Sequence, residues 1–164
     1  GPMTNPAGAK RQVIGVFSQD WQYKMAEVLK LLGSEHALIV HSQGLDEIRL
    51  DAPSSVVELK AGTISQYEIN PQQFGFAKRD AAQLNALVAT STDSSLALIK
   101  QSLTDDTSAA ADIVSLNAGA SIYVAGVATS LGNGIAMAQD AIATGLANER
   151  FNELVRVTKM MVAT

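Results

Sequence analysis

The 164-residue sequence contains no cysteine, so it can form neither a disulfide framework nor a thiolate nucleophile or metal ligand. Basic residues are also few: 12 Lys and Arg face 16 Asp and Glu, and they adjoin each other only at Lys10-Arg11 and Lys78-Arg79. This charge balance argues against nucleic acid or an anionic membrane as the main partner. An anionic ligand would need another source of positive charge, and a metal ion is one candidate.

Long apolar runs are absent as well. No stretch of about 18 apolar residues occurs, so we expect no membrane span. The most apolar segment, 113–128, is interrupted by small and polar residues, namely Ser115, Asn117, Gly119, Ser121 and Gly126. The first residues lack the basic, apolar and cleavage-site pattern of a signal peptide. The length and the 47% hydrophobic content fit one domain with a sizeable core.

The most informative feature that is present is a pair of adjacent carboxylates behind an apolar segment. Residues 37–40 read as a strand, a short glycine-containing loop follows, and the loop ends in Asp46 and Glu47. In α/β proteins, ligands bind beyond the carboxyl ends of the strands. Mg²⁺ usually binds through one or two carboxylates plus phosphate oxygens. Asp46 and Glu47 are therefore a candidate metal and phosphate site, and a solvated turn is the other interpretation of this pattern.

The first half of the chain predicts a βαβ unit followed by a ribbon. Residues 12–17 and 36–40 read as buried strands, which a right-handed crossover helix would place in parallel. The predicted apolar face of that helix consists of Trp21, Met25, Val28, Leu29 and Leu32. Short alternating segments at 48–51, 56–59 and 63–69 predict an antiparallel ribbon with a turn at residues 60–62.

The second half predicts helices. Residues 72–89 are expected to be irregular with one short helix, docked onto the core by Phe74 and Phe76. Beyond them the periodicity predicts four helices, the first capped by Thr92 or Asp93 and the second a long, buried helix at 107–127. The other apolar faces are Leu96, Ile99 and Leu103; Leu131, Ile135, Ala138 and Ile142; and Phe151, Leu154, Val155, Thr158 and Val162. A ribbon and two parallel strands cannot cover that much apolar helix, so we expect further strands upstream.

Taken in order, short motifs along the chain resemble those of the anthranilate phosphoribosyltransferase family. The motifs are Gly1-Pro2-Met3-Thr4-Asn5-Pro6-Ala7, Gly15-Val16-Phe17-Ser18, Met25-Ala26-Glu27-Val28-Leu29, Leu32-Gly33, Val40-His41-Ser42, Gly44-Leu45-Asp46-Glu47, Phe74-Gly75 and Leu116-Asn117-Ala118. The match covers essentially all of this chain, but only the C-terminal half or so of the family's usual length.

The resemblance implies an α/β fold, the C-terminal portion of a phosphoribosyltransferase α/β domain of the nucleoside phosphorylase/phosphoribosyltransferase type. Residues 1–164 would form a single partial domain, with the βαβ unit and ribbon in 1–70 and a mainly helical part in 71–164. The family's N-terminal helical domain and first strands would be absent from it. The resemblance also implies a cytoplasmic enzyme whose parent form is a homodimer through that helical domain.

The activity implied by the resemblance is transfer of the phosphoribosyl group from phosphoribosyl diphosphate to anthranilate, in tryptophan biosynthesis. The products would be N-(5-phosphoribosyl)anthranilate and diphosphate. Asp46 and Glu47 match the family's acidic pair that holds Mg²⁺, and Gly1 and Pro2 match residues on the anthranilate side of the cleft. Gly1-Pro2 could also be the remnant of a cleaved tag, but the fit of the whole segment favours native residues.

Several family motifs are missing. The glycine-rich diphosphate loop Gly-Thr-Gly-Gly-Asp, the Lys-His-Gly-Asn-Arg segment and the arginine that meets the anthranilate carboxylate all lie upstream of Gly1 in the family. We therefore expect this chain alone to be inactive, and the alternative is a non-catalytic fragment or a binding relative of the same fold. His36 and His41 are expected to be structural, and Asn117 to brace or cap a loop.

Overall fold

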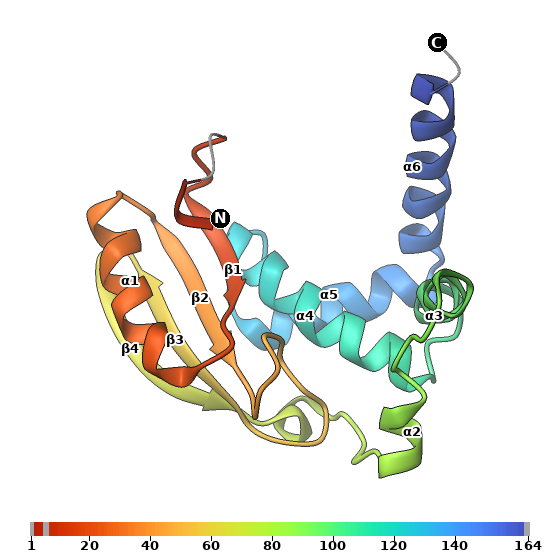
Figure 1. The fold of residues 1–164 in the computed structure, drawn as a ribbon, viewed down its shortest axis with the longest axis horizontal. Coiled ribbons are helices and arrows are strands. Elements are labelled where there is room, and N and C mark those ends of the chain that lie inside the picture. Colours follow the sequence, from red (N-terminus) through yellow and green to blue (C-terminus); the bar gives the residue numbers. More distant parts are fainter. Residues whose placement is uncertain (1, 5–6, 163–164) are drawn as a thin grey trace.

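The computed structural model describes residues 2–4 and 7–162, which form a four-stranded sheet with helices on both faces (Figure 1). The strands are β1 (Arg11–Gly15), β2 (His36–His41), β3 (Ser54–Lys60) and β4 (Thr63–Ile69), adjacent in that order. β1 and β2 pair in parallel, whereas β2 with β3 and β3 with β4 pair antiparallel. The predicted α/β class, parallel pair and ribbon at 56–59 and 63–69 are confirmed.

The helices lie between and beyond these strands. The α-helices are α1 (Gln22–Leu31), α2 (Ala81–Asn85), α3 (Thr92–Thr104), α4 (Ala109–Ala125), α5 (Leu131–Ala143) and α6 (Leu146–Val162). The short 3-10 helices are η1 (Pro2–Thr4), η2 (Gln19–Trp21) and η3 (Pro71–Phe74). No helix within these described residues is both long and apolar enough to cross a membrane.

The helix α1 covers one face of the sheet, and its buried face matches the predicted one only in part. Leu29 is buried with Ala26 against strand residues such as Ile39, and Met25 packs against them, as predicted. The other predicted positions, Trp21, Val28 and Leu32, are 49%, 40% and 53% exposed. They differ from the prediction because a polar residue, Gln22, occupies part of the buried face. Its amide donates to the carbonyl oxygens of Ile39 (2.6 Å) and Ser55 (2.8 Å) and is therefore satisfied.

The opposite face of the sheet packs on α4 and α5 and contains the larger core cluster. Leu116, Ala120 and Val124 of α4 are buried there. A Cβ added to Gly119 would lie 2.5 Å from the Ile135 Cα, so α4 and α5 touch through their backbones. This confirms the prediction of a buried, closely packed helix within residues 107–127.

Residues 48–51 do not form the predicted strand. Ile48 and Leu50 are buried, but the backbone N–H of Ile48 donates to the Asn117 side chain and that of Arg49 donates to Ser54 Oγ. Side chains thus satisfy backbone groups that a sheet ladder would otherwise have paired. The alternation of apolar residues at 48–51 therefore reflects the burial of Ile48 and Leu50 and not pairing with another strand.

The later helices differ in how far they are covered. Phe76 is buried in the larger core cluster and Phe74 packs against it, as expected. Helix α3 begins one residue earlier than predicted, because Ser91 caps it in a capping box with Ser94. Helix α6 has no buried residue and projects away from the sheet (Figure 1), so the expected faces of α3 and α6 are largely exposed.

Candidate metal and phosphate site

The acidic loop, residues 42–47, leaves the carboxyl end of β2 through a two-residue turn. The backbones of Ser42 and Leu45 bond to each other in both directions, at 3.0 and 2.8 Å. Between them, Gln43 and Gly44 both have positive φ angles of 44° and 87°. Two such residues in succession are typical of a type I′ turn, in which the chain reverses within two residues. The returning segment carries Asp46 and Glu47.

The returning segment passes directly over the end of β1. A Cβ added to Gly15 would collide with the Asp46 carbonyl group and lie 2.7 Å from the Asp46 Cβ. Val13 and Gly15 alternate with Ile14 along β1, and Val13 packs in the cluster on the α4 side. The acidic loop therefore lies over the carboxyl ends of both parallel strands, on the face toward α4, in agreement with the expected location.

Helix α4 holds the other side of the loop. The Asn117 side-chain oxygen accepts the Ile48 N–H at 3.0 Å, and its amide donates to the carbonyl oxygens of Ile48 and Ile113 at 3.0 Å each. Ile48 follows Glu47 directly and is fully buried. The expectation that Asn117 braces a loop is thus confirmed, and the loop is the acidic one.

Asp46 and Glu47 lie at a pocket of about 440 Å³. The pocket is lined by Leu45, Asp46, Glu47, Arg49, Leu50, Asp51, Leu84, Asn85, Leu87, Val88 and Ile113. One side is therefore charged and belongs to residues 45–51, whereas the other is mostly apolar and comes from α2 and the residues after it.

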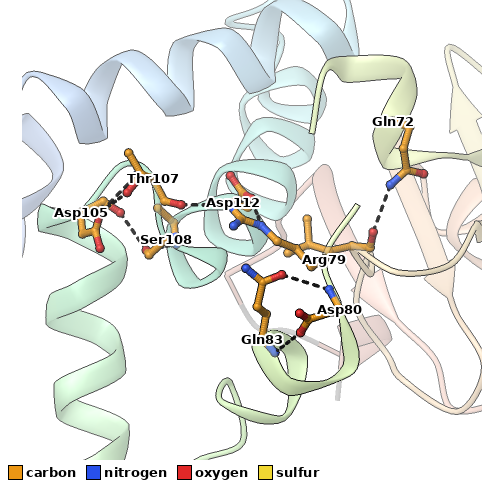
Figure 2. Close-up of polar contacts among 10 residues, drawn as sticks. Gln72, Arg79, Asp80, Gln83, Asp105, Thr107, Ser108 and Asp112 are labelled. Carbon is orange, nitrogen blue, oxygen red and sulfur yellow. Dashed lines mark hydrogen bonds and ion pairs between the residues drawn. The ribbon is translucent and has the colours of Figure 1, made fainter. Parts of the chain in front are cut away.

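The apolar wall is held in place by polar contacts of the two residues directly before α2. The Arg79 guanidinium pairs with Asp112 of α4 and donates to the Thr107 carbonyl oxygen at 2.9 Å (Figure 2). Asp80 and Gln83 form a capping box at the start of α2. The wall is thus fixed to the amino-terminal part of α4, the same helix that binds the acidic loop through Asn117.

A second charged pair lies in the pocket. Arg49 donates from Nε to Asp51 Oδ1 at 2.6 Å and from Nη2 to Oδ2 at 2.5 Å. These hydrogen bonds hold the pKa of the Asp51 carboxyl below its usual value and raise the pKa of Arg49. The positive charge of Arg49 is therefore already balanced by its neighbour.

Asp46 and Glu47, in contrast, are not paired with a positively charged side chain of the described residues. Both are exposed, and within residues 2–4 and 7–162 neither side chain forms a hydrogen bond or ion pair. No group of three or more His, Asp or Glu side chains in the described part of the chain could hold a metal ion. Two free carboxylates beside a pocket nevertheless fit Mg²⁺, which completes its octahedral shell with water and phosphate oxygens.

Of the other predicted site residues, only Pro2 belongs to the described part of the chain. Gly1 is outside the described residues. Pro2 belongs to η1, and its neighbour Met3 lines a hollow together with Lys10 and Leu32, at the end where β1 begins. Asp46 lies at the end where β1 stops. The structure therefore does not bring Pro2 and the acidic pair together, and the role of Gly1 and Pro2 stays a prediction.

The two histidines make the structural contacts that we expected. His41 donates from Nδ1 to the Val16 carbonyl oxygen at 2.8 Å, which ties the ends of β1 and β2. His36 is buried at the opposite end of β2, where its Nε2 lies 2.7 Å from Glu58 Oε1.

Sequence reasoning did not identify three parts of this site: the contact of Gly15 with Asp46, Arg49 in the pocket, and the apolar wall from α2. Gly15 interrupts an otherwise apolar strand segment, a pattern that often marks close approach of another backbone and could have been noticed. The wall could not have been found, because its position depends on the pairing of Arg79 with a helix 33 residues away.

The parallel strand ends, the helices on both sheet faces and the pocket at the strand termini define an α/β domain with a candidate binding site at the carboxyl ends of its strands. The chain belongs to the glycosyl transferase family, a/b domain, whose family model matches residues 1–148.

Its similarity to particular members is high over nearly its whole length. An anthranilate phosphoribosyltransferase from Teredinibacter turnerae is 50% identical over 98% of this chain and 48% of its own length. One from Ectopseudomonas mendocina is 51% identical over 96% of this chain and 46% of its own length. The chain thus spans about half the length of the curated relatives it matches, and its resemblance to anthranilate phosphoribosyltransferases is confirmed.

Solved structures of anthranilate phosphoribosyltransferases have the same fold over nearly the whole of this chain. The crystal structure of anthranilate phosphoribosyltransferase from Thermus thermophilus matches with a TM-score of 0.80 and 38% identity, over 95% of this chain and 46% of that one. The enzyme from Saccharomyces cerevisiae in complex with PRPP and Mg has a TM-score of 0.75, over 91% of this chain and 43% of that one. At 21% identity, the yeast protein supports the fold alone.

Proposed function

We propose that this chain supplies the magnesium-holding side of the active site of an anthranilate phosphoribosyltransferase. That enzyme would transfer the phosphoribosyl group of phosphoribosyl diphosphate to the amine of anthranilate, giving N-(5-phosphoribosyl)anthranilate and diphosphate, a step in tryptophan biosynthesis. The observation that carries the proposal is the exposed, unpaired pair Asp46 and Glu47 at the ends of two parallel strands, in a chain about 50% identical to enzymes of that name.

Within this site, Asp46 and Glu47 would hold Mg²⁺ through their carboxylate oxygens. The bound ion supplies neutralisation of negative charge on the diphosphate leaving group. The Arg49 guanidinium is already paired with Asp51 and therefore adds no free positive charge to the pocket. The nucleophile is a weakly basic aromatic amine, so we assign no general base to this chain, and positioning would carry much of the rate.

The remaining parts of the proposal follow from the family resemblance. Gly1 and Pro2 would line the anthranilate side of the cleft, and the parent enzyme would be a cytoplasmic homodimer that needs neither nucleic acid nor a membrane. The 164 residues contain no glycine-rich diphosphate loop. We therefore expect the chain alone to show no turnover of anthranilate.

A chimaera tests the proposal directly. This chain would replace the matching half of the Teredinibacter turnerae relative, so that the relative supplies the upstream motifs. We expect the chimaera, but not the isolated chain, to consume anthranilate when phosphoribosyl diphosphate and Mg²⁺ are present, as followed by anthranilate fluorescence.

In the same chimaera, the double variant Asp46→Asn, Glu47→Gln removes the proposed ligands. We expect its activity to fall by more than about 100-fold, beyond the usual effect of losing a residue that only supports a metal ligand. Glu68→Gln, an exposed carboxamide substitution on β4, is the matched control and should leave the rate unchanged. A double variant that is as active as this control would overturn the assignment of the metal site.

A further inference from the structure

The acidic loop is held from two sides by residues that do not reach the pocket. One is Gly15, whose missing side chain leaves the space in which the Asp46 backbone lies. The other is Asn117, which bonds both backbone groups of Ile48. The first contact is with Asp46 itself and the second is with Ile48, directly after Glu47, so the two contacts span the acidic pair.

We propose that Gly15 and Asn117 are positioning residues that set the geometry of the Asp46 and Glu47 carboxylates for a divalent cation; this inference rests on the function proposed above. The carboxylates themselves cannot set that geometry. They form no hydrogen bond or ion pair with the described residues that would fix their direction. Their placement therefore depends on the backbone from which they extend, and that backbone is fixed at Gly15 and Asn117.

The steric argument for Gly15 is specific to its position in the pleat. Any side chain at this position would point toward α4 and into the Asp46 carbonyl group, so the loop or the strand must move. Gly132 on α5 provides a matched contrast. A Cβ added there meets only the Phe74 ring, at 3.7 Å, which is an ordinary van der Waals contact.

The argument for Asn117 rests on hydrogen-bond satisfaction. The N–H of the buried Ile48 donates to Asn117. Ile48 itself belongs to no helix or strand, so no regular backbone pairing is available to it. Removing the amide leaves the Ile48 N–H and carbonyl oxygen unpaired, and they would move toward water. Asn133 on α5 is the contrasting position, because it is exposed and bonds only to neighbouring groups of its own helix start.

The test uses the isotope-labelled 164-residue chain, with amide exchange and Mg²⁺ titration followed by NMR. In Gly15→Ala and Asn117→Ala we expect shifted amide signals at residues 45–48, and in Asn117→Ala faster exchange of the Ile48 amide. We also expect the Mg²⁺ dissociation constant to rise about 10-fold, as is usual when support of a metal ligand is lost. Gly132→Ala and Asn133→Ala should match the unchanged chain in all these measurements.

Folding is monitored in the same spectra by the amides of β4, which β3 separates from β2 and the loop. If Asn117→Ala does not fold, the comparison is made with Asn117→Gln, which adds no charge and keeps an amide but displaces it by one methylene from the Ile48 backbone. A purely structural role would lower the free energy of unfolding without changing the Mg²⁺ affinity of the folded molecules.

The outcomes separate the two proposals. Unchanged loop signals and exchange in both variants would overturn the positioning role, whatever the metal does. Unchanged Mg²⁺ affinity in variants with a displaced loop would overturn it as well. If the unchanged chain itself shows no Mg²⁺ response at Asp46 and Glu47, the metal site of the proposed function fails, and with it the positioning for a cation.

Discussion

The two ends of the central sheet both present carboxylates on the face toward α4, and their surroundings are opposite. Where β2 begins, Glu58 is buried and accepts hydrogen bonds from His36 (2.7 Å), Tyr67 (3.0 Å) and Tyr123 (2.8 Å). Where β2 ends, Asp46 and Glu47 are exposed and unpaired. The hydrogen bonds of Glu58 join β3 to β4 and α4. The carboxylate oxygens of Asp46 and Glu47 are free to bind a ligand instead.

The buried end is a closed network. Lys60 donates to the Tyr123 hydroxyl at 2.9 Å and lies over its ring, and His36 meets the same ring edge-on. Burial and the neighbouring Glu58 raise the pKa of Tyr67, and burial raises that of Tyr123, so both stay neutral hydrogen-bond donors. Burying a charge is costly unless it is fully hydrogen-bonded, and here each oxygen of Glu58 has a partner.

Among the substitutions that test this difference between the two ends of the sheet, we expect Glu58→Ala to have the largest effect on stability. It leaves the buried His36 and two tyrosine hydroxyls without their acceptor, so we expect the free energy of unfolding to fall by about 3 kcal/mol, as for other broken buried pairs. Urea denaturation measures it. Glu68→Ala, on the exposed side of the adjacent strand, is the control, and an equal loss in both variants would show that Glu58 does not stabilise the sheet.

A smaller effect concerns Asp51, which lies at the acidic end but is paired. Its pKa is lowered by the hydrogen bonds from Arg49, so its contribution is present above the unfolded-state pKa of about 4 and is lost as the pH falls through the lowered value. We expect Asp51→Asn to lower the free energy of unfolding at pH 7 by less than about 1 kcal/mol, since the pair is partly exposed. Near pH 2 the difference should vanish.

Urea denaturation at a series of pH values measures this dependence. A difference between Asp51→Asn and the unchanged chain that is the same at pH 7 and pH 2 would contradict the role of the Arg49 pair.

The smallest effect is expected where the carboxylates are free. Asp46→Asn with Glu47→Gln should change the free energy of unfolding by less than about 0.5 kcal/mol, because no contact in the described chain is lost. Thermal and urea denaturation without added metal measure it. A loss close to that of Glu58→Ala would mean that the two ends of the sheet do not differ, and that Asp46 and Glu47 are structural.

Much of the architecture could be predicted from residue patterns. The βαβ unit, the β3–β4 ribbon and the long buried helix all follow from strong periodicity over their length. The face of α1 was predicted only in part, at Met25 and Leu29, because buried Gln22 is satisfied by backbone carbonyl groups that only the folded sheet brings near. The alternation at 48–51 failed for the same reason, since Asn117 supplies its pairing from 69 residues away.

For the site, the approximate place of the acidic pair was readable from the chain itself, and its chemistry stays a prediction. Two hard oxygen ligands directly after a strand, beyond a glycine turn, predict a cation and phosphate site because parallel strands end at a common edge. The tertiary structure decided what surrounds them. Gly15, Asn117 and the α2 wall come from segments distant in sequence. Pairing of β1 with β2 brings Gly15 to the acidic loop, and packing on α4 brings Asn117 and the wall.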